Sequence, residues 1–158
     1  MRFLVWETST RIHRVEGKDT MGPNDAQIVR VFSREPKGSI ADVTLDSHTD
    51  AEIVIDAEAG GTLHQNQGAY CVTLVVRDLT DGSIIPAKVQ GATKAGEVEG
   101  HFADQHWMNP AANFSFTVSK AELAKRKGHL AEAYGAVSYG SQTPGATLAL
   151  SQPFLIQK

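Results

Sequence analysis

Alternating hydrophobic and polar residues predict strands along most of this chain. The clearest alternation spans residues 70–77, where Tyr70 and every second residue after it share one face and Cys71 and its alternates share the other. A strand of this length and regularity is typical of the centre of a sheet. Further strands are predicted at residues 28–32, 41–45, 51–57, 83–89, 113–118, 130–139, 146–150 and 154–156.

One short helix is predicted between two of the late strands. Ser119 and Glu122 have the spacing of a capping box, in which each side chain bonds the backbone N–H of the other residue. Good helix formers follow, and Gly128 stands where a left-handed residue ends a helix. The expected helix therefore spans about residues 120–127.

Three segments with weaker patterns also allow predictions: the last hairpin, residues 83–89 and residues 90–100. In the last hairpin, Leu148 and Leu150 are predicted to face the core, and Pro153 indicates a bulge or an edge because proline cannot donate to a ladder. Pro86 places residues 83–89 towards a sheet edge. The glycine-rich residues 90–100 are expected to form the most mobile loop.

The order strand, capped helix, strand, hairpin and final strand ends here in the S-x-P-F-x-I pattern of residues 151–156. This back half resembles that of the immunoglobulin-like sandwich modules found in large bacterial surface and secreted proteins. The resemblance implies an all-β, immunoglobulin-like antiparallel β-sandwich of about seven to nine strands that serves spacing or adhesion. The cysteine pair of antibody domains is absent, since Cys71 is the only cysteine.

Length and composition indicate one ordinary globular domain. The 158 residues are enough to bury a hydrophobic core, and we expect a single sandwich domain at residues 26–158. Residues 1–25 read as an N-terminal arm or linker, which pairs with a sheet edge or with another subunit. Trp6 is the candidate interface residue of this arm, because a large apolar ring on a polar segment needs a surface to cover it.

Charge and hydropathy exclude several partners. A net charge of −3 provides no field that attracts nucleic acid or an anionic membrane. The apolar run at residues 3–6 is too short for a signal peptide or a membrane span. As written, the chain is expected in the cytoplasm, or secreted or particle-associated if a leader was removed.

Candidate chemistry concentrates in residues 101–109. His101, Asp104 and His106 offer nitrogen and oxygen ligands for a divalent metal such as zinc. Trp107 with Asn109 and His106 instead suggests a ligand-binding group, since a tryptophan beside polar side chains suits the apolar face of a sugar. A purely structural role for this segment is the third interpretation.

Known catalytic motifs, such as G-x-S-x-G, C-x-x-C and H-E-x-x-H, are missing. We therefore expect a non-catalytic binding or structural module without a cofactor, acting through protein–protein or glycan contacts and able to form a homo-oligomer. The alternative is a small metal-dependent hydrolase that uses His101, Asp104 and His106.

Overall fold

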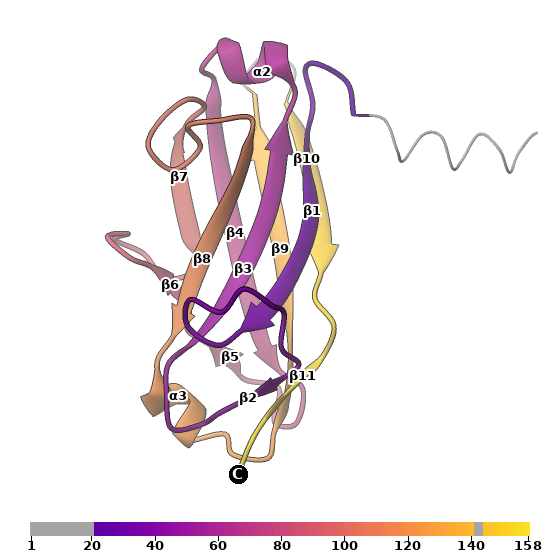
Figure 1. The fold of residues 1–158 in the computed structure, drawn as a ribbon. Coiled ribbons are helices and arrows are strands. Elements are labelled where there is room, and N and C mark those ends of the chain that lie inside the picture. Colours follow the sequence, from indigo (N-terminus) through magenta and orange to yellow (C-terminus); the bar gives the residue numbers. More distant parts are fainter. Residues whose placement is uncertain (1–20, 141–143) are drawn as a thin grey trace, which may run out of the picture.

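The computed structural model describes residues 21–140 and 144–158. They form two packed β-sheets with one short helix at each end of the sandwich (Figure 1). The predicted all-β sandwich is confirmed. Trp6 and most of the predicted arm lie outside the described residues.

The first sheet has four strands in the described part of the chain, and all its neighbours are antiparallel. Its order is β1 (Ala26–Arg34), β3 (Ala51–Ala59), β8 (Ala111–Val118) and β6 (Lys88–Val89).

The second sheet has seven strands among the described residues, with the long strands β4 and β9 at its centre. The central position predicted for residues 70–77 is confirmed, because β4 pairs with β9 on one side and with β5 and β7 on the other. The one parallel pair described in this sheet joins β11 to β2. The strands are β2 (Thr44–Leu45), β11 (Phe154–Ile156), β9 (Leu130–Tyr139), β4 (Ala69–Asp78), β5 (Ile84–Ile85), β7 (Glu97–His101) and β10 (Gly145–Leu150).

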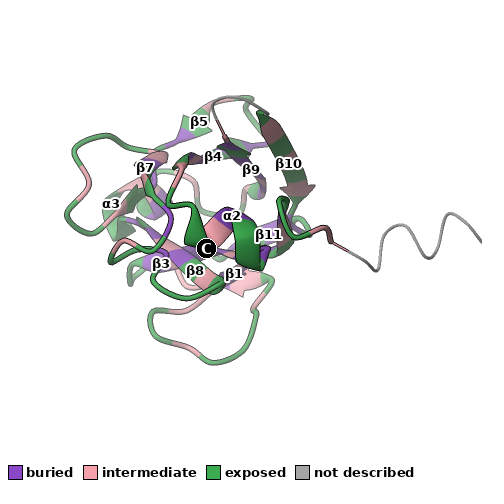
Figure 2. Cartoon of the chain, turned by 90° about the horizontal axis from the view of Figure 1, so that it is seen from above, coloured by how far each residue is buried: buried purple, intermediate pink, exposed green. Residues whose placement is uncertain are grey.

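The core lies between the two sheets, where the buried residues of both layers face each other (Figure 2). At Gly135 the layers approach closely, since a Cβ there would lie 3.0 Å from Val31 and 3.1 Å from Ile55. A side chain at this position would therefore require the Val31 and Ile55 side chains to shift.

Two short helices occupy the ends of the sandwich. Helix α3 (Lys120–Ala124) has half of the predicted capping box: the Ser119 hydroxyl accepts from the Glu122 N–H at 3.3 Å, but the Glu122 carboxylate accepts from Arg126. It is shorter than predicted because the chain turns after Ala124 and the Gly128 N–H donates to Ile156 in β11. Helix α2 (Gly61–Gln65) was not predicted, since its five residues give no measurable helical period.

The predicted strand at residues 83–89 is divided between the two sheets. Ile84–Ile85 pairs with β4, whereas Lys88–Val89 pairs with β8. The break falls at Pro86, which has no N–H for a ladder.

Two further expectations are wrong. Residues 90–100 are not entirely loop, because β7 begins at Glu97 and its inward Val98 is buried. Leu148 and Leu150 do not face the core, because in β10 they stand opposite Ala136 and Tyr134 on the outer side of β9. The side chains of β10 do alternate as predicted, but Leu148 and Leu150 are on the side that faces solvent.

Candidate functional site

Trp107 is a core residue and presents no ring face to solvent. Its side chain is 0% exposed and packs edge-on against Tyr70, Phe102 and Phe114, at ring centroid distances of 5.0, 4.9 and 5.4 Å. The indole Nε1–H donates to the Pro110 carbonyl at 3.0 Å. The predicted contact of Trp107 with a ligand therefore does not fit this geometry, although Asn109 remains exposed.

Asp104 closes the turn between β7 and β8. Its carboxylate accepts from the backbone N–H groups of His101, His106 and Trp107 at 3.1, 2.9 and 2.9 Å, and from the Tyr70 hydroxyl at 2.9 Å. Burial by itself would raise the pKa of Asp104, but these hydrogen bonds hold that pKa below its ordinary value. The pKa of Tyr70 is raised, first by burial and then by the adjacent Asp104 carboxylate.

The predicted metal ligands do not converge. His101 and His106 are exposed at either end of the turn, while the Asp104 carboxylate is held by donors from its own chain. Among the described residues, the two groups whose ligand atoms are close enough to share an ion lie elsewhere. One contains Asp78, Asp81 and His129, and the other Cys71, Glu97 and Glu99.

In the first group, the Asp78 carboxylate is already engaged by other side chains of the protein. His129 Nδ1 lies 2.6 Å from the Asp78 Oδ2, and Arg126 Nε lies 3.4 Å from the same oxygen. The other Asp78 oxygen accepts from the backbone of Thr80 and Asp81. This buried network joins the end of β4 to the segment before β9, which is a structural role.

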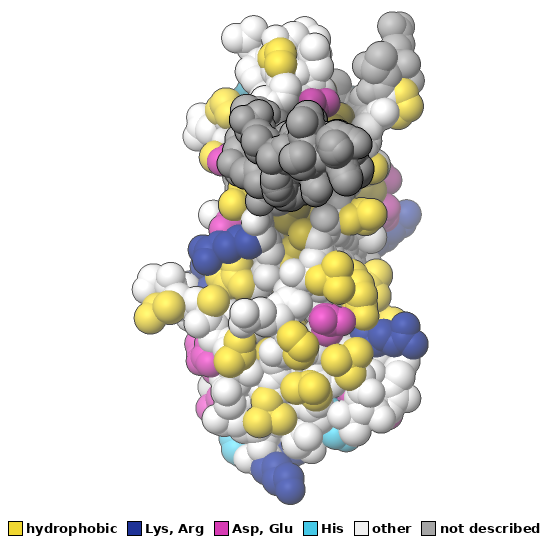
Figure 3. Space-filling view, turned by 90° about the vertical axis from the view of Figure 1, so that its right-hand side faces the viewer, with side chains coloured by type: hydrophobic (Ala, Val, Ile, Leu, Met, Phe, Trp, Pro, Cys, Tyr) yellow, Lys and Arg dark blue, Asp and Glu magenta, His cyan; other side chains and the backbone are white. Residues whose placement is uncertain are grey.

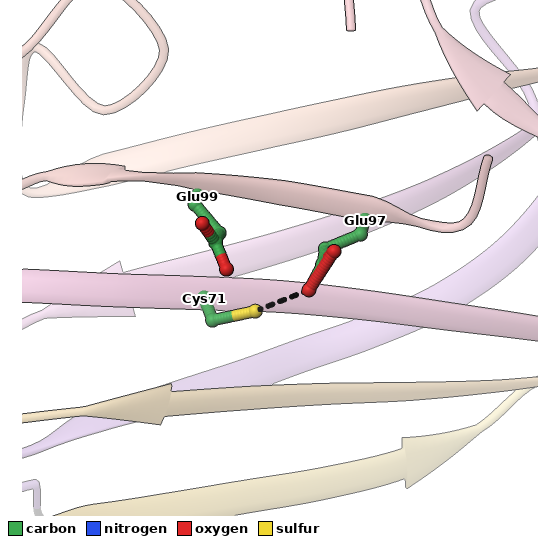
Figure 4. A group of neighbouring side chains, drawn as sticks. All are labelled: Cys71, Glu97 and Glu99. Carbon is green, nitrogen blue, oxygen red and sulfur yellow. Dashed lines mark hydrogen bonds between the residues drawn. The ribbon is translucent and has the colours of Figure 1, made fainter. Parts of the chain in front are cut away.

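The second group lies on the outer side of the seven-stranded sheet (Figure 4). Cys71 Sγ donates to Glu97 Oε1 at 3.5 Å. Burial, followed by the nearby Glu97 and Glu99 carboxylates, raises the pKa of the Cys71 thiol, so the thiol stays protonated at neutral pH. A protonated thiol is a poor nucleophile.

These three residues belong to a continuous surface that strand pairing creates, which we name the outer face. Directly opposed residues of antiparallel strands share one side of a sheet, so the registers define three rows across β10, β9, β4 and β7. The rows are Ala146, Ser138, Cys71 and Glu99; Leu148, Ala136, Thr73 and Glu97; and Leu150, Tyr134 and Val75.

The outer face is apolar on the β10 side and acidic on the β7 side. Leu148 is 77% exposed, Leu150 59% and Val75 39%. Hydrophobic side chains gather in the middle of the molecule's side when it is seen from the edge formed by β1 and β10 (Figure 3). At the upper end of the face an open hollow of about 580 Å³ is lined by residues that include Cys71, Ser138 and Tyr139.

The sequence did not predict this surface. The alternation of residues 146–150 indicates that successive side chains point to opposite sides of the strand, but it does not tell which side faces the core. The sequence did contain one signal. Thr147 and Ala149, which alternate with Leu148 and Leu150, are small enough to pack closely against another layer, so they could also be the inward residues. Thr147 does point inward to the neighbouring sheet, where its hydroxyl accepts from the Ile28 N–H at 3.3 Å.

No protein-family model matches the sequence, and no curated protein matches it. Solved structures with a similar fold include AggA, the major subunit of aggregative adherence fimbriae type I from Escherichia coli, at 9% identity and a TM-score of 0.43. That similarity covers 84% of this chain and 99% of AggA.

Two further similar structures come from bacterial adhesins. CfaE, the adhesive subunit of the CFA/I fimbria of enterotoxigenic E. coli, has 7% identity and a TM-score of 0.33, over 78% of this chain and 48% of CfaE. The collagen-binding subdomain of the Enterococcus faecalis surface protein ACE has 5% identity and a TM-score of 0.30, over 84% of this chain and 98% of that subdomain. These similarities concern the sandwich architecture alone.

Within the described residues, no helix has both the length and the apolar character needed to cross a membrane.

Proposed function

We propose that this domain is a non-catalytic binding or structural module that acts through protein contacts on the outer face. The observation that carries the proposal is the adjacent exposure of Leu148, Leu150 and Val75 on one side of a sheet. Contiguous apolar side chains on a rigid sheet, beside a polar rim, are typical of protein interaction surfaces.

The energetics favour an occupant for this surface. Full burial of a leucine side chain contributes roughly 1.5–3 kcal/mol, so covering Leu148 and Leu150 is worth several kcal/mol before the costs of association. The apolar part of the outer face is aliphatic except for Tyr134. A partner with apolar side chains fits it better than a glycan, whose sites usually offer an exposed aromatic ring with polar amides.

The metal-dependent hydrolase has less support. It would need His101, Asp104 and His106 to share one ion, but the Asp104 carboxylate already accepts three backbone N–H groups and the Tyr70 hydroxyl. Metal binding at this turn would have to break those bonds.

The proposal is tested by comparing three immobilised full-length proteins in extracts of the source cells: wild type, the double variant Leu148→Asp/Leu150→Asp, and Met108→Asp. Met108 is a matched control, because it is 62% exposed but lies between β7 and β8, outside the outer face. We expect a partner that wild type and Met108→Asp retain and that the double variant loses at least tenfold. Capture of the same proteins by all three would refute the proposal.

A further inference from the structure

We propose that the outward side of the seven-stranded sheet binds a second copy of this chain, related to the first by a two-fold axis. The axis runs along the row of Leu150, Tyr134 and Val75, at right angles to the strands, so the strands of the two copies are antiparallel across the interface. This dimer rests on the function proposed above, because it makes a second copy the partner of the outer face.

Exposed hydrophobic residues extend beyond the outer face along the same side of the sheet. The strand registers add two further rows there, which are Glu132, Arg77 and Ile84, and then Leu130 with Leu155. Ile84, Leu130 and Leu155 are exposed. Together with Leu148, Leu150 and Val75 they make up six of the eleven large hydrophobic residues exposed in the described chain, so this one side concentrates the apolar surface.

The outward side of the four-stranded sheet is polar by contrast. Arg30 Nε lies 2.8 Å from Asp56 Oδ2, and Arg34 Nε lies 2.9 Å from Glu52 Oε1. The Arg30 guanidinium also covers the ring of Phe32, at 4.1 Å from its centroid. These charges are paired within one sheet and leave little apolar surface to cover, so the seven-stranded sheet is the side that gains from a partner.

The area of this side suits a second globular copy. β10 and β11 flank the same edge of β9, and β7 and β5 flank the far edge of β4, so four strands lie abreast along the ten residues of β4. At about 3.4 Å per residue and about 4.8 Å per strand, the side measures roughly 34 by 19 Å, or about 650 Å². This footprint is comparable with the roughly 800 Å² of accessible surface that each partner buries in a standard interface.

The distribution of apolar residues selects the direction of the axis. An axis parallel to the strands would place β10 of one copy over β7 of the other, where the exposed Leu148 would meet Glu97. An axis at right angles to the strands places β10 over β11 of the second copy, where Leu148 lies towards Leu155. The second arrangement covers apolar surface with apolar surface, which is the favourable contact.

The same arrangement brings opposite charges together. Glu97 stands in the row of Thr73 and Arg77 in its own row, and these rows lie two residues on either side of Val75 along β4. Rotation about the axis therefore places Glu97 of each copy beside Arg77 of the other. Sheets that stack about 10 Å apart are within reach of these two long side chains, and symmetry makes the contact twice.

Sedimentation equilibrium of the purified full-length protein tests the dimer. We expect the mass of two chains at micromolar concentrations, with reversible dissociation on dilution. Leu148→Asp/Leu150→Asp should raise the dissociation constant at least a hundredfold, whereas Met108→Asp should leave it unchanged. A wild-type protein with the mass of one chain at every concentration, or equal dissociation constants for all three proteins, would overturn the inference.

A charge exchange tests the two-fold arrangement itself. Arg77→Glu and Glu97→Arg should each weaken self-association at least tenfold, because each copy then meets a like charge. An equimolar mixture of the two variants should recover the lost affinity, since every introduced charge meets its opposite in the mixed dimer. Lys88→Glu, in β6 of the other sheet, is the control and should have no effect. A mixture that associates no more tightly than the separate variants would overturn the proposed axis.

The capture experiment keeps the two proposals separable. If the purified protein is a monomer but the double variant loses a partner from the extract, the binding function stands and self-association fails. If the dimer requires the outer face but capture from the extract does not depend on it, self-association stands and the function tested by capture fails instead.

Discussion

The imidazole Nδ1 of His129 lies 2.6 Å from Oδ2 of Asp78, a carboxylate that is completely buried at one end of the sandwich. Arg126 approaches the same oxygen and also bonds Glu122 of α3. The contact ties the end of β4 to the start of β9, the two central strands of the larger sheet.

Removal of Asp78 should destabilise the domain strongly. Asp78→Ala leaves the His129 and Arg126 side chains without their shared carboxylate, and breaking a buried pair of this kind costs about 3–5 kcal/mol. Asp81→Ala is the matched control, because the Asp81 side chain is exposed and 4.0 Å from His129, so we expect a much smaller loss of stability. Urea unfolding measures both, and equal losses would contradict the structural role of Asp78.

Asp104 should make stability depend on acid pH. Because the pKa of Asp104 in the folded protein is held below its unfolded value, its contribution is complete above the unfolded pKa of about 3.9 and is lost as pH falls through the folded pKa. Asp104→Asn should lower the free energy of unfolding at pH 7 by about 1–2 kcal/mol and flatten its decline below pH 4. An identical difference between the two proteins from pH 7 to pH 2 would rule out this linkage.

Trp107 should matter for stability and not for sugar recognition. Trp107→Ala removes a fully buried ring and should cost about 3–5 kcal/mol, while Trp107→Phe should cost less because it mainly loses the hydrogen bond to Pro110. Thermal unfolding checks both. In the Trp6→Phe protein, the remaining Trp107 emission should not respond to a glycan panel, and a saturable shift would restore the ligand-binding interpretation.

Cys71 should react slowly with alkylating agents. Burial and the neighbouring carboxylates raise its thiol pKa, which lowers the thiolate fraction at pH 8. Glu97→Gln removes both a charge and a hydrogen-bond acceptor, so the rate with iodoacetamide should increase severalfold. Glu122→Gln, on α3 at the other end of the sandwich, provides the control, and equal acceleration by both variants would exclude a local effect of Glu97.

The sequence predicted those strands and helices that are specified by residues close together in the chain. The two-residue period of residues 70–77 and the Ser119 cap on the Glu122 N–H depend on neighbours within a few positions, and both are present in the structure. Strand β7 was missed because its Glu-Val-Glu-Gly-His sequence is a weak strand former. It becomes a strand by pairing with β4, a long-range contact.

The sequence by itself determined an all-β chain with a central strand at residues 70–77 and a capped helix after Ser119. Only the tertiary structure decided which side of each strand faces the core and which aromatic rings are buried. Leu148 points outward because its partner Ala136 stands on the outer side of β9, and Trp107 is buried because Tyr70, Phe102 and Phe114 surround it. Alternation specifies a period, but only packing against another layer tells which side of a strand is removed from water.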